Sequence, residues 1–155
     1  DHLAAGHNQY APMAGLPALL EAIAESALRR HGWRIDPAAE VTVTAGGTEA
    51  LFAAIHAVVR AGDEVILLDP SYDSYAPAVE LAGGRPVHVP LSLADFGIDW
   101  ERLAAAIGPR TRMLVVNTPL NPAGSVLAAA DWDRIADLLE GRDAITDLPE
   151  GRWTE

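Results

Sequence analysis

Gly46 and Gly47 stand between a short β-branched run, Val41–Thr44, and a helical pattern. A glycine turn at the start of a helix leaves backbone N–H groups free at the positive end of the helix dipole, which suits a phosphate. A plain tight turn with Thr48 as the helix N-cap fits the same residues. The turn matches neither the Gly-x-Gly-x-x-Gly fingerprint nor the Walker loop, which requires a lysine. A phosphate site and a capped helix start are therefore both open.

A second segment of interest, Asp69–Tyr75, directly follows the apolar run Glu64–Leu68. An aromatic side chain at the end of a strand can lie flat against a planar heteroaromatic ligand. The alternative is that Tyr72 or Tyr75 simply fills the edge of the core. Taken alone, this segment favours the core-filling interpretation.

The third segment, Asn117–Gly124, follows the apolar run 112–116. Its two prolines and its glycine favour an extended loop and withhold donors from a sheet. Asn121 precedes Pro122, which holds it away from helical geometry, so its amide is expected to project into the space at the sheet edge. Asn-Pro turns are common, but two asparagines in so rigid a loop indicate a placed hydrogen-bond donor.

The elements that must position these loops follow from hydrophobic periodicity. The spacing predicts a helix from about residue 16, with Pro17 in its first turn and Gly32 as its stop. It also predicts helices over 48–60, 75–82, 99–107 and 129–139, and strands over 41–44, 64–68, 86–89, 112–116 and 144–145.

Buried strands that alternate with helices indicate an α/β fold, with a mostly parallel sheet and helices on both faces. In such sheets ligands bind beyond the carboxyl ends of the strands, where the three segments are expected to lie. We find no internal repeat or linker, so we expect residues 1–155 to form a single domain.

The composition of the chain argues against several classes of function. The net charge of −11 argues against a nucleic-acid partner, and the longest apolar stretch, 51–59, is too short to span a membrane. The sequence has no cysteine, which fits a cytoplasmic protein without disulfides, and we interpret its five histidines as structural or surface residues rather than metal ligands. The first residue is Asp1, which suggests a piece of a longer or processed chain.

Taken together, the segments resemble the fold-type-I aminotransferases of class I, most closely the methionine and kynurenine aminotransferase branch. The likeness runs from about residue 6 to 141 and leaves 142–155 as a divergent tail. The matching text is Asn8-Gln9-Tyr10, TAGGTEAL from Thr44, GDEVILLDPSYDSY from Gly62 and NTPLNPAG from Asn117.

The resemblance implies an incomplete large domain that binds pyridoxal 5′-phosphate and forms a homodimer, with amino acids and 2-oxo acids as substrates. It assigns the cofactor phosphate to the backbone amides of Gly47, Thr48 and Glu49. By the same likeness, Tyr72 stacks on the pyridine ring. Asn121 binds the phenolic oxygen of the ring and lies near the substrate carboxylate.

Two further cofactor contacts are implied by the resemblance. Tyr10 reaches the phosphate of a neighbouring subunit. Asp147 is the candidate for the carboxylate that keeps the pyridine nitrogen protonated. Its context fits loosely, because Glu150 stands where the family has a tyrosine. A turn residue before Leu148-Pro149 is the alternative for Asp147.

The sequence contains no lysine, since all eleven basic residues are arginine. The family uses a lysine amine to bind the cofactor covalently and to move a proton, and arginine cannot replace it. We therefore expect this chain alone not to transaminate. The family places that lysine downstream of the Asp147 motif.

Other functions remain open at this point. Another fold-type-I enzyme, such as a carbon–sulfur lyase or a decarboxylase, would share these motifs. The missing lysine favours a non-catalytic regulatory module that binds the cofactor. A generic nucleotide-binding domain fits less well, because the glycine fingerprint is absent.

Overall fold

The computed structural model describes residues 1, 3–6, 8–141 and 145–146. They divide into two compact units, Asp1–Ala50 and Leu51–Glu155. Helix α2 (Gly47–Val58) begins in the first unit and continues into the second. The prediction of a single domain over 1–155 stays a prediction.

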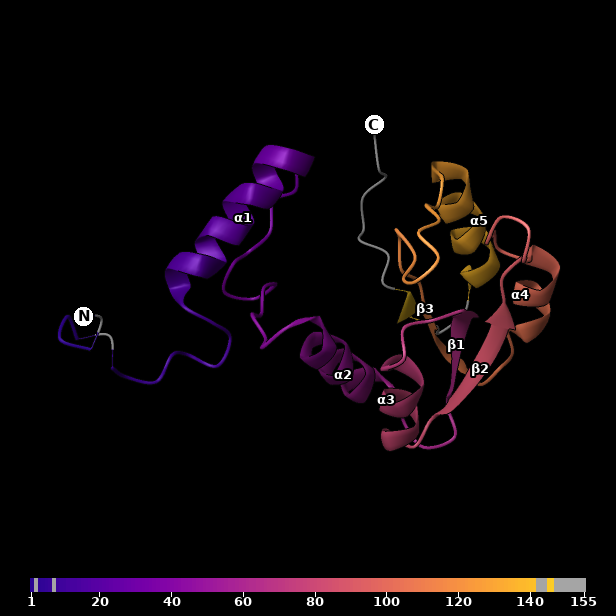
Figure 1. The fold of residues 1–155 in the computed structure, drawn as a ribbon, viewed down its shortest axis with the longest axis horizontal. Coiled ribbons are helices and arrows are strands. Elements are labelled where there is room, and N and C mark those ends of the chain that lie inside the picture. Colours follow the sequence, from indigo (N-terminus) through magenta and orange to yellow (C-terminus); the bar gives the residue numbers. More distant parts are fainter. Residues whose placement is uncertain (2, 7, 142–144, 147–155) are drawn as a thin grey trace. The chain divides into compact units, whose positions relative to one another are not determined.

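The first unit contains helix α1 (Pro17–His31), as the periodicity predicts (Figure 1). Pro17 stands at its start, where no intrahelical donor is needed. Gly32 ends it in the left-handed conformation, φ 73°, and donates its N–H to the carbonyl of Leu28. Arg29 and Arg30 in the last turn complement the helix dipole.

The strand predicted over 41–44 is wrong: these residues are irregular in the structure. Val43 donates its N–H to the carbonyl of Ala14 at 2.8 Å. The β-branched side chains favour an extended chain, but a strand also needs a ladder of hydrogen bonds with a neighbour. No described strand pairs with 41–44.

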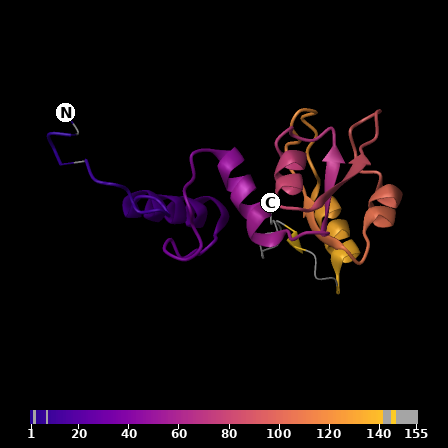
Figure 2. The same ribbon diagram turned by 90° about the horizontal axis from the view of Figure 1, so that it is seen from below.

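The second unit holds a four-stranded sheet in the order β2-β1-β3-β4, and every pair is parallel (Figure 2). Helices alternate with the strands along the chain, as predicted, and observed and predicted ends differ by one or two residues. The elements are β1 (Glu64–Asp69), α3 (Tyr75–Leu81), β2 (Arg85–Pro90), α4 (Trp100–Ala106), β3 (Thr111–Val115), α5 (Ala129–Leu139) and β4 (Ile145–Thr146).

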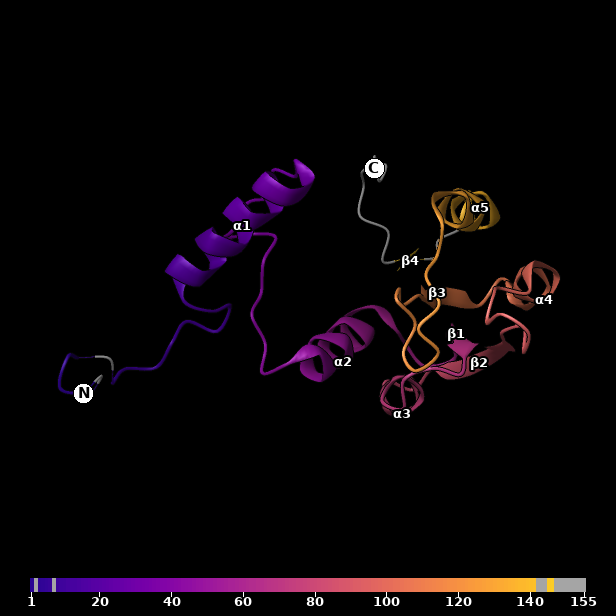
Figure 3. The same ribbon diagram turned by 45° about the horizontal axis from the view of Figure 1, so that its top comes forward.

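Helices cover both faces of this sheet, which confirms the predicted α/β class. On one face, Ile66 and Leu68 of β1 pack with α4 and α5. On the other face, Val65 and Leu67 pack with α3 and with the later turns of α2. Figure 3 shows α3 and α5 on opposite sides of the strands. Strand β1 is therefore buried on both faces, as its uninterrupted apolar sequence predicts.

Gly84 allows β2 to begin close to α3 and to Val59, the residue after α2. A Cβ atom at this position would lie 2.6 Å from Cγ1 of Val59 and 3.1 Å from Cγ1 of Val79. The short Gly83-Gly84 turn that ends α3 therefore brings the chain into β2 with no room for a side chain.

At the amino ends of the strands, Glu64 ties β1 to its two neighbours. Arg85 of β2 lies 2.7 Å from Oε1 of Glu64, and Nη2 of Arg110, just before β3, lies 2.6 Å from the same atom. The carboxylate is buried, and hydrogen bonds from Arg85 and then from Arg110 lower its pKa.

Candidate functional site

Two of the loops predicted to bind a ligand leave the same edge of the sheet. β1 and β3 are parallel neighbours, so their carboxyl ends, Asp69 and Val115, lie at one edge. The loop after β1 carries Tyr72, and the loop after β3 carries Asn121. The sheet topology therefore brings these two candidates to one rim of the second unit.

The loop after β1 is held by the carboxylate of Asp69. Oγ of Ser71 donates to Oδ1 of Asp69 at 2.8 Å, and Nδ1 of His88 on β2 lies 2.7 Å from Oδ2. The carbonyl of Asp69 accepts from the N–H of Leu91 at 2.8 Å. The first residues of this loop are thus tied to the neighbouring strand.

The next residues of this loop place two tyrosines against each other. The rings of Tyr72 and Tyr75 lie 5.7 Å apart at 72°, an edge-to-face contact that aromatic pairs favour. Tyr75 is buried in the core, and burial, with a smaller effect of Tyr72, raises the pKa of its hydroxyl. Tyr72 is half-buried. Tyr75 therefore plugs the core edge, and Tyr72 is the tyrosine available to a ligand.

The loop after β3 is anchored at its middle. Leu120 is buried in the core, donates its N–H to the carbonyl of Ser125 at 2.8 Å and accepts from the N–H of Gly124. Oγ1 of Thr118 accepts from the N–H of Leu127 at 3.0 Å. Asn121 lies next to the buried Leu120 but is itself exposed, so its amide is free to meet a ligand.

The glycine turn before α2 is held by local hydrogen bonds. Gly46 has φ 112°, a conformation that favours glycine, and its carbonyl accepts from Oγ1 of Thr44 at 2.9 Å. The carboxylate of Glu49 accepts from the N–H of Ala45. The helix begins at Gly47, so Thr48 lies within the first turn and is not the N-cap, which makes the capping interpretation wrong.

The first-turn amides of α2 point away from the helix body, as at any helix start. A Cβ atom at Gly46 or Gly47 would meet nothing within 4 Å, so no described atom crowds the turn on the side where side chains would project. Gly47, Thr48 and Glu49 are exposed. This part of the chain can hold an anion on backbone donors.

Two further predicted contacts, Tyr10 and Asp147, belong to other parts of the chain. Tyr10 lies in the first unit and is fully exposed. Asp147 follows β4 along the chain and lies outside the described residues. Roles for both stay predictions, as do those of Gly47, Thr48, Glu49, Tyr72 and Asn121 in binding a cofactor.

Sequence reasoning missed the contact between His88 and Asp69. The sequence predicts His88 only as a structural or surface residue, and it predicts no contact for Asp69 at the start of the loop. The two are nineteen positions apart, and only the pairing of β1 with β2 shows that they meet. No local sequence signal predicts that pairing.

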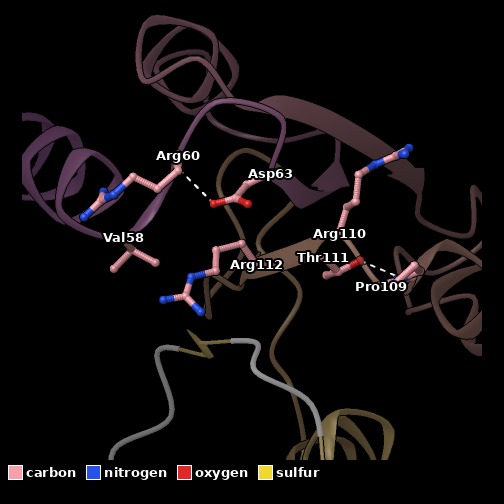
Figure 4. A pocket seen from close by; sticks show the side chains of 8 residues that line it. Val58, Arg60, Asp63, Pro109, Arg110, Thr111 and Arg112 are labelled. Atoms are coloured by element: carbon pink, nitrogen blue, oxygen red, sulfur yellow. Dashed lines mark hydrogen bonds between the residues drawn. The ribbon is translucent and has the colours of Figure 1, made fainter.

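The second unit also has two larger hollows. One, of about 320 Å³, is mainly apolar and lies between α2 and β3, and Leu51, Ile55, Met113 and Asn117 are among its lining residues. The other, of about 460 Å³, is polar and lies at the amino ends of β1 and β3 (Figure 4).

The polar hollow is a weaker candidate for a ligand site. Nη1 of Arg60 donates to the carbonyls of His56 and Val59, and the guanidinium of Arg110 is bound to Glu64. Figure 4 shows Arg110 directed away from the hollow. Arg60 therefore serves the end of α2, and Arg110 serves the carboxylate of Glu64.

No helix among residues 1, 3–6, 8–141 and 145–146 is long and apolar enough to cross a membrane. The same residues contain no group of three or more histidine, aspartate or glutamate side chains placed to hold a metal ion.

Comparison with known proteins gives consistent matches. The family model of aminotransferase class I and II matches residues 2–146. The methionine aminotransferase of Escherichia coli is 49% identical over 142 residues, which are 92% of this chain and 37% of that protein. Mouse kynurenine–oxoglutarate transaminase 1 is 38% identical over 149 residues, 89% of this chain and 35% of its own length.

A crystal structure of the E. coli methionine aminotransferase superposes with a TM-score of 0.90 at 48% identity, and the match covers 94% of this chain and 38% of that one. The chain thus spans about 37% of the length of such relatives. The family match ends at residue 146, so it includes the first five residues of the predicted divergent tail, 142–155.

Proposed function

Because this chain belongs to the class I and II aminotransferases, we propose that it forms part of an enzyme that exchanges an amino group between an amino acid and a 2-oxo acid. The cofactor of this family is pyridoxal 5′-phosphate. In this proposal the chain supplies the phosphate- and ring-binding part of the site. The substrates are amino acids and 2-oxo acids, and a homodimer completes the site through Tyr10.

The observation that carries the proposal is the fit of the donor set to the cofactor. The start of α2 offers first-turn amides at an uncrowded turn, which suits a dianionic phosphate. The sheet edge offers the ring of Tyr72 for a planar ring and the amide of Asn121 for an oxygen acceptor. These are the kinds of group that a phosphorylated pyridine requires.

Each residue has a defined task in this proposal. The amides of Gly47, Thr48 and Glu49 hold the phosphate, and Tyr72 orients the ring by stacking on one face. Asn121 donates to the phenolic oxygen and lies near the substrate carboxylate. Asp147 accepts the N–H of the pyridine nitrogen and so keeps that proton in place. When bound, the cofactor supplies an electron sink for the carbanion at the substrate carbon.

Equilibrium titration of the purified chain tests the cofactor proposal. We expect pyridoxal 5′-phosphate to bind at least about tenfold more tightly than pyridoxal, because each charge-assisted hydrogen bond to the phosphate contributes about 1.5–3 kcal/mol. Ultraviolet–visible absorbance and equilibrium dialysis report the affinity. Equal affinity for the two compounds, or no binding, would contradict the proposal.

A second measurement tests the consequence of the missing lysine. After borohydride treatment with pyridoxal 5′-phosphate, we expect no pyridoxyl mass on any side chain, because the sequence offers no lysine amine. Intact-protein and peptide mass spectrometry provide the readout, with a lysine-containing aminotransferase as positive control. A pyridoxyl group on a side chain of this chain would refute the prediction.

The cysteine-free sequence is compatible with a reducing compartment, so a cytoplasmic location stays part of the proposal. Fractionation of cells that express the natural gene checks it.

A further inference from the structure

The carboxylate of Asp69 joins three segments at the rim of the sheet. One oxygen accepts from the hydroxyl of Ser71 at 2.8 Å, and the other lies 2.7 Å from Nδ1 of His88. Asp69 is the last residue of β1, and His88 lies on the neighbouring strand, β2. Ser71 is the residue directly before Tyr72.

The chemistry of this contact fixes the donors. An ionised carboxylate only accepts hydrogen bonds, so at this contact Nδ1 of His88 carries a proton and donates a hydrogen bond to Oδ2 of Asp69. The hydroxyl of Ser71 also donates to Asp69 and not to the imidazole. The three residues therefore do not form a nucleophile–base relay, in which the hydroxyl would donate to the histidine. Their arrangement instead holds a loop.

We propose that His88 is a positioning residue for Tyr72. His88 holds the carboxylate of Asp69, Asp69 holds the hydroxyl of Ser71, and the backbone after Ser71 sets the ring of Tyr72. This inference rests on the proposed function, because it matters through the stack of Tyr72 on the cofactor ring.

The other side of the loop is already fixed by the fold. The N–H of Tyr75 donates to the carbonyl of Tyr72 at 3.1 Å, and the ring of Tyr75 is buried against the core. Between β1 and Tyr72, the side-chain hydrogen bonds among the described residues are those of the Asp69 carboxylate. The N–H of Leu91, just after β2, holds the backbone carbonyl of Asp69, and His88 adds the side-chain link from the Asp69 carboxylate to the same strand.

Exposure limits the energy of the contact. The side chains of His88 and Asp69 are 48% and 32% exposed, so solvent weakens the pair, and its loss should not unfold the protein. The expected effect is local: the residues around Tyr72 sample more conformations, and ordering them on binding lowers the affinity for the cofactor by about three- to tenfold.

Variants of His88 in the full chain separate positioning from bulk and charge. In His88→Asn the side-chain amide can donate from a place close to that of Nδ1, whereas His88→Gln places its amide further out, near Nε2. His88→Ala removes the donor. His56→Ala is the matched control, because this histidine lies on α2 and bonds the carbonyl of Phe52.

Amide hydrogen exchange over residues 71–76 is the first readout, and it needs no cofactor. We expect exchange to be about five- to tenfold faster in His88→Ala and His88→Gln, and close to wild type in His88→Asn and His56→Ala. Far-ultraviolet circular dichroism confirms that each variant is folded. If exchange is unchanged in His88→Ala, or if His88→Asn behaves like His88→Ala, the positioning role is wrong.

The affinity for pyridoxal 5′-phosphate is the second readout and distinguishes the two proposals. If wild type binds the cofactor and every variant binds it equally well, the positioning role fails while the proposed function stands. If wild type does not bind it, the cofactor proposal fails, and the exchange rates still decide whether His88 orders the loop. Weaker binding by His88→Ala, restored in His88→Asn, supports both.

Discussion

At the scale of single residues, Tyr72 and Tyr75 have the same side chain and different tasks. Tyr75 is buried and closes the core, whereas Tyr72 is half-buried and presents its ring at the sheet edge. Tyr72 stays partly exposed beside this edge-to-face contact, so its ring can be tested as a stacking surface.

We expect Tyr72→Leu to weaken binding of pyridoxal 5′-phosphate by about three- to tenfold, because a stacked aromatic pair contributes about 0.5–1.5 kcal/mol beyond burial. Tyr72→Phe keeps the ring and should stay close to wild type. Titration by absorbance compares the two variants. Equal losses in Leu and Phe would show that the hydroxyl, not the ring, is used.

The lowered pKa of Glu64 leads to a prediction about how the stability of the fold depends on pH. Its pKa is lowered in the folded chain from the ordinary 4.5 by hydrogen bonds from Arg85 and Arg110, so it stabilises the fold above that value. As the pH falls through the folded pKa, the carboxylate gains a proton and this stabilisation is lost.

Glu64→Gln should therefore lower the free energy of unfolding by about 1–2 kcal/mol at neutral pH, a modest value because both arginines are largely exposed. The difference from wild type should shrink on acidification below pH 4.5. Urea unfolding at several pH values measures it, with the exposed Glu80→Gln as control. A difference in the free energy of unfolding that does not change with pH would show that the charge of Glu64 is not the source of the stabilisation.

At the scale of elements, the strands and helices of the second unit were predictable and their contacts were not. The apolar runs of β1 and β3 and the spacing in α5 identify these elements to within a residue or two. The strand predicted over 41–44 failed because local β propensity does not supply a neighbouring strand.

In the candidate site, too, the residue types were predictable from the sequence and a contact between strands was not. Glycine, tyrosine and asparagine after strands are visible in the sequence, and the parallel order of β1 and β3 explains why two of the loops share an edge. The bond between His88 and Asp69 depends on which strands pair, a long-range property that single-sequence patterns do not contain.

The turn before α2 offers a matched pair of glycine substitutions. Gly46 has φ 112°, so Gly46→Ala should cost about 1–2 kcal/mol of stability through backbone strain. Gly47 begins the helix without a positive φ and has open space around it, so Gly47→Ala should be neutral or slightly stabilising. Thermal and urea unfolding compare them. Similar losses in both would mean that strain at Gly46 is not the cause.

At the scale of the whole molecule, apolar surface and net charge act against each other. The apolar hollow between α2 and β3 is open, and its lining includes Leu51 and Val58. The net charge of −11 makes two copies repel each other.

We expect the chain to bind a hydrophobic dye such as anilinonaphthalene sulfonate and to self-associate more as salt rises, because about 0.15 M salt reduces the Debye length to about 8 Å. Sedimentation velocity at low and high salt provides the test. Leu51→Gln should reduce dye binding, with the exposed Leu93→Gln as control. Association that weakens with salt would point to charge pairing instead.

The central position of β1 also has a consequence for the order of folding during synthesis. Its partners, β2 and β3, both come later in the chain, and β3 ends at Val115. While the ribosome still covers that segment, β1 has an open edge and its apolar residues lack one flank of their cover. A nascent chain halted shortly before residue 115 should therefore be a better substrate for chaperones and proteases than one halted after α5 has emerged.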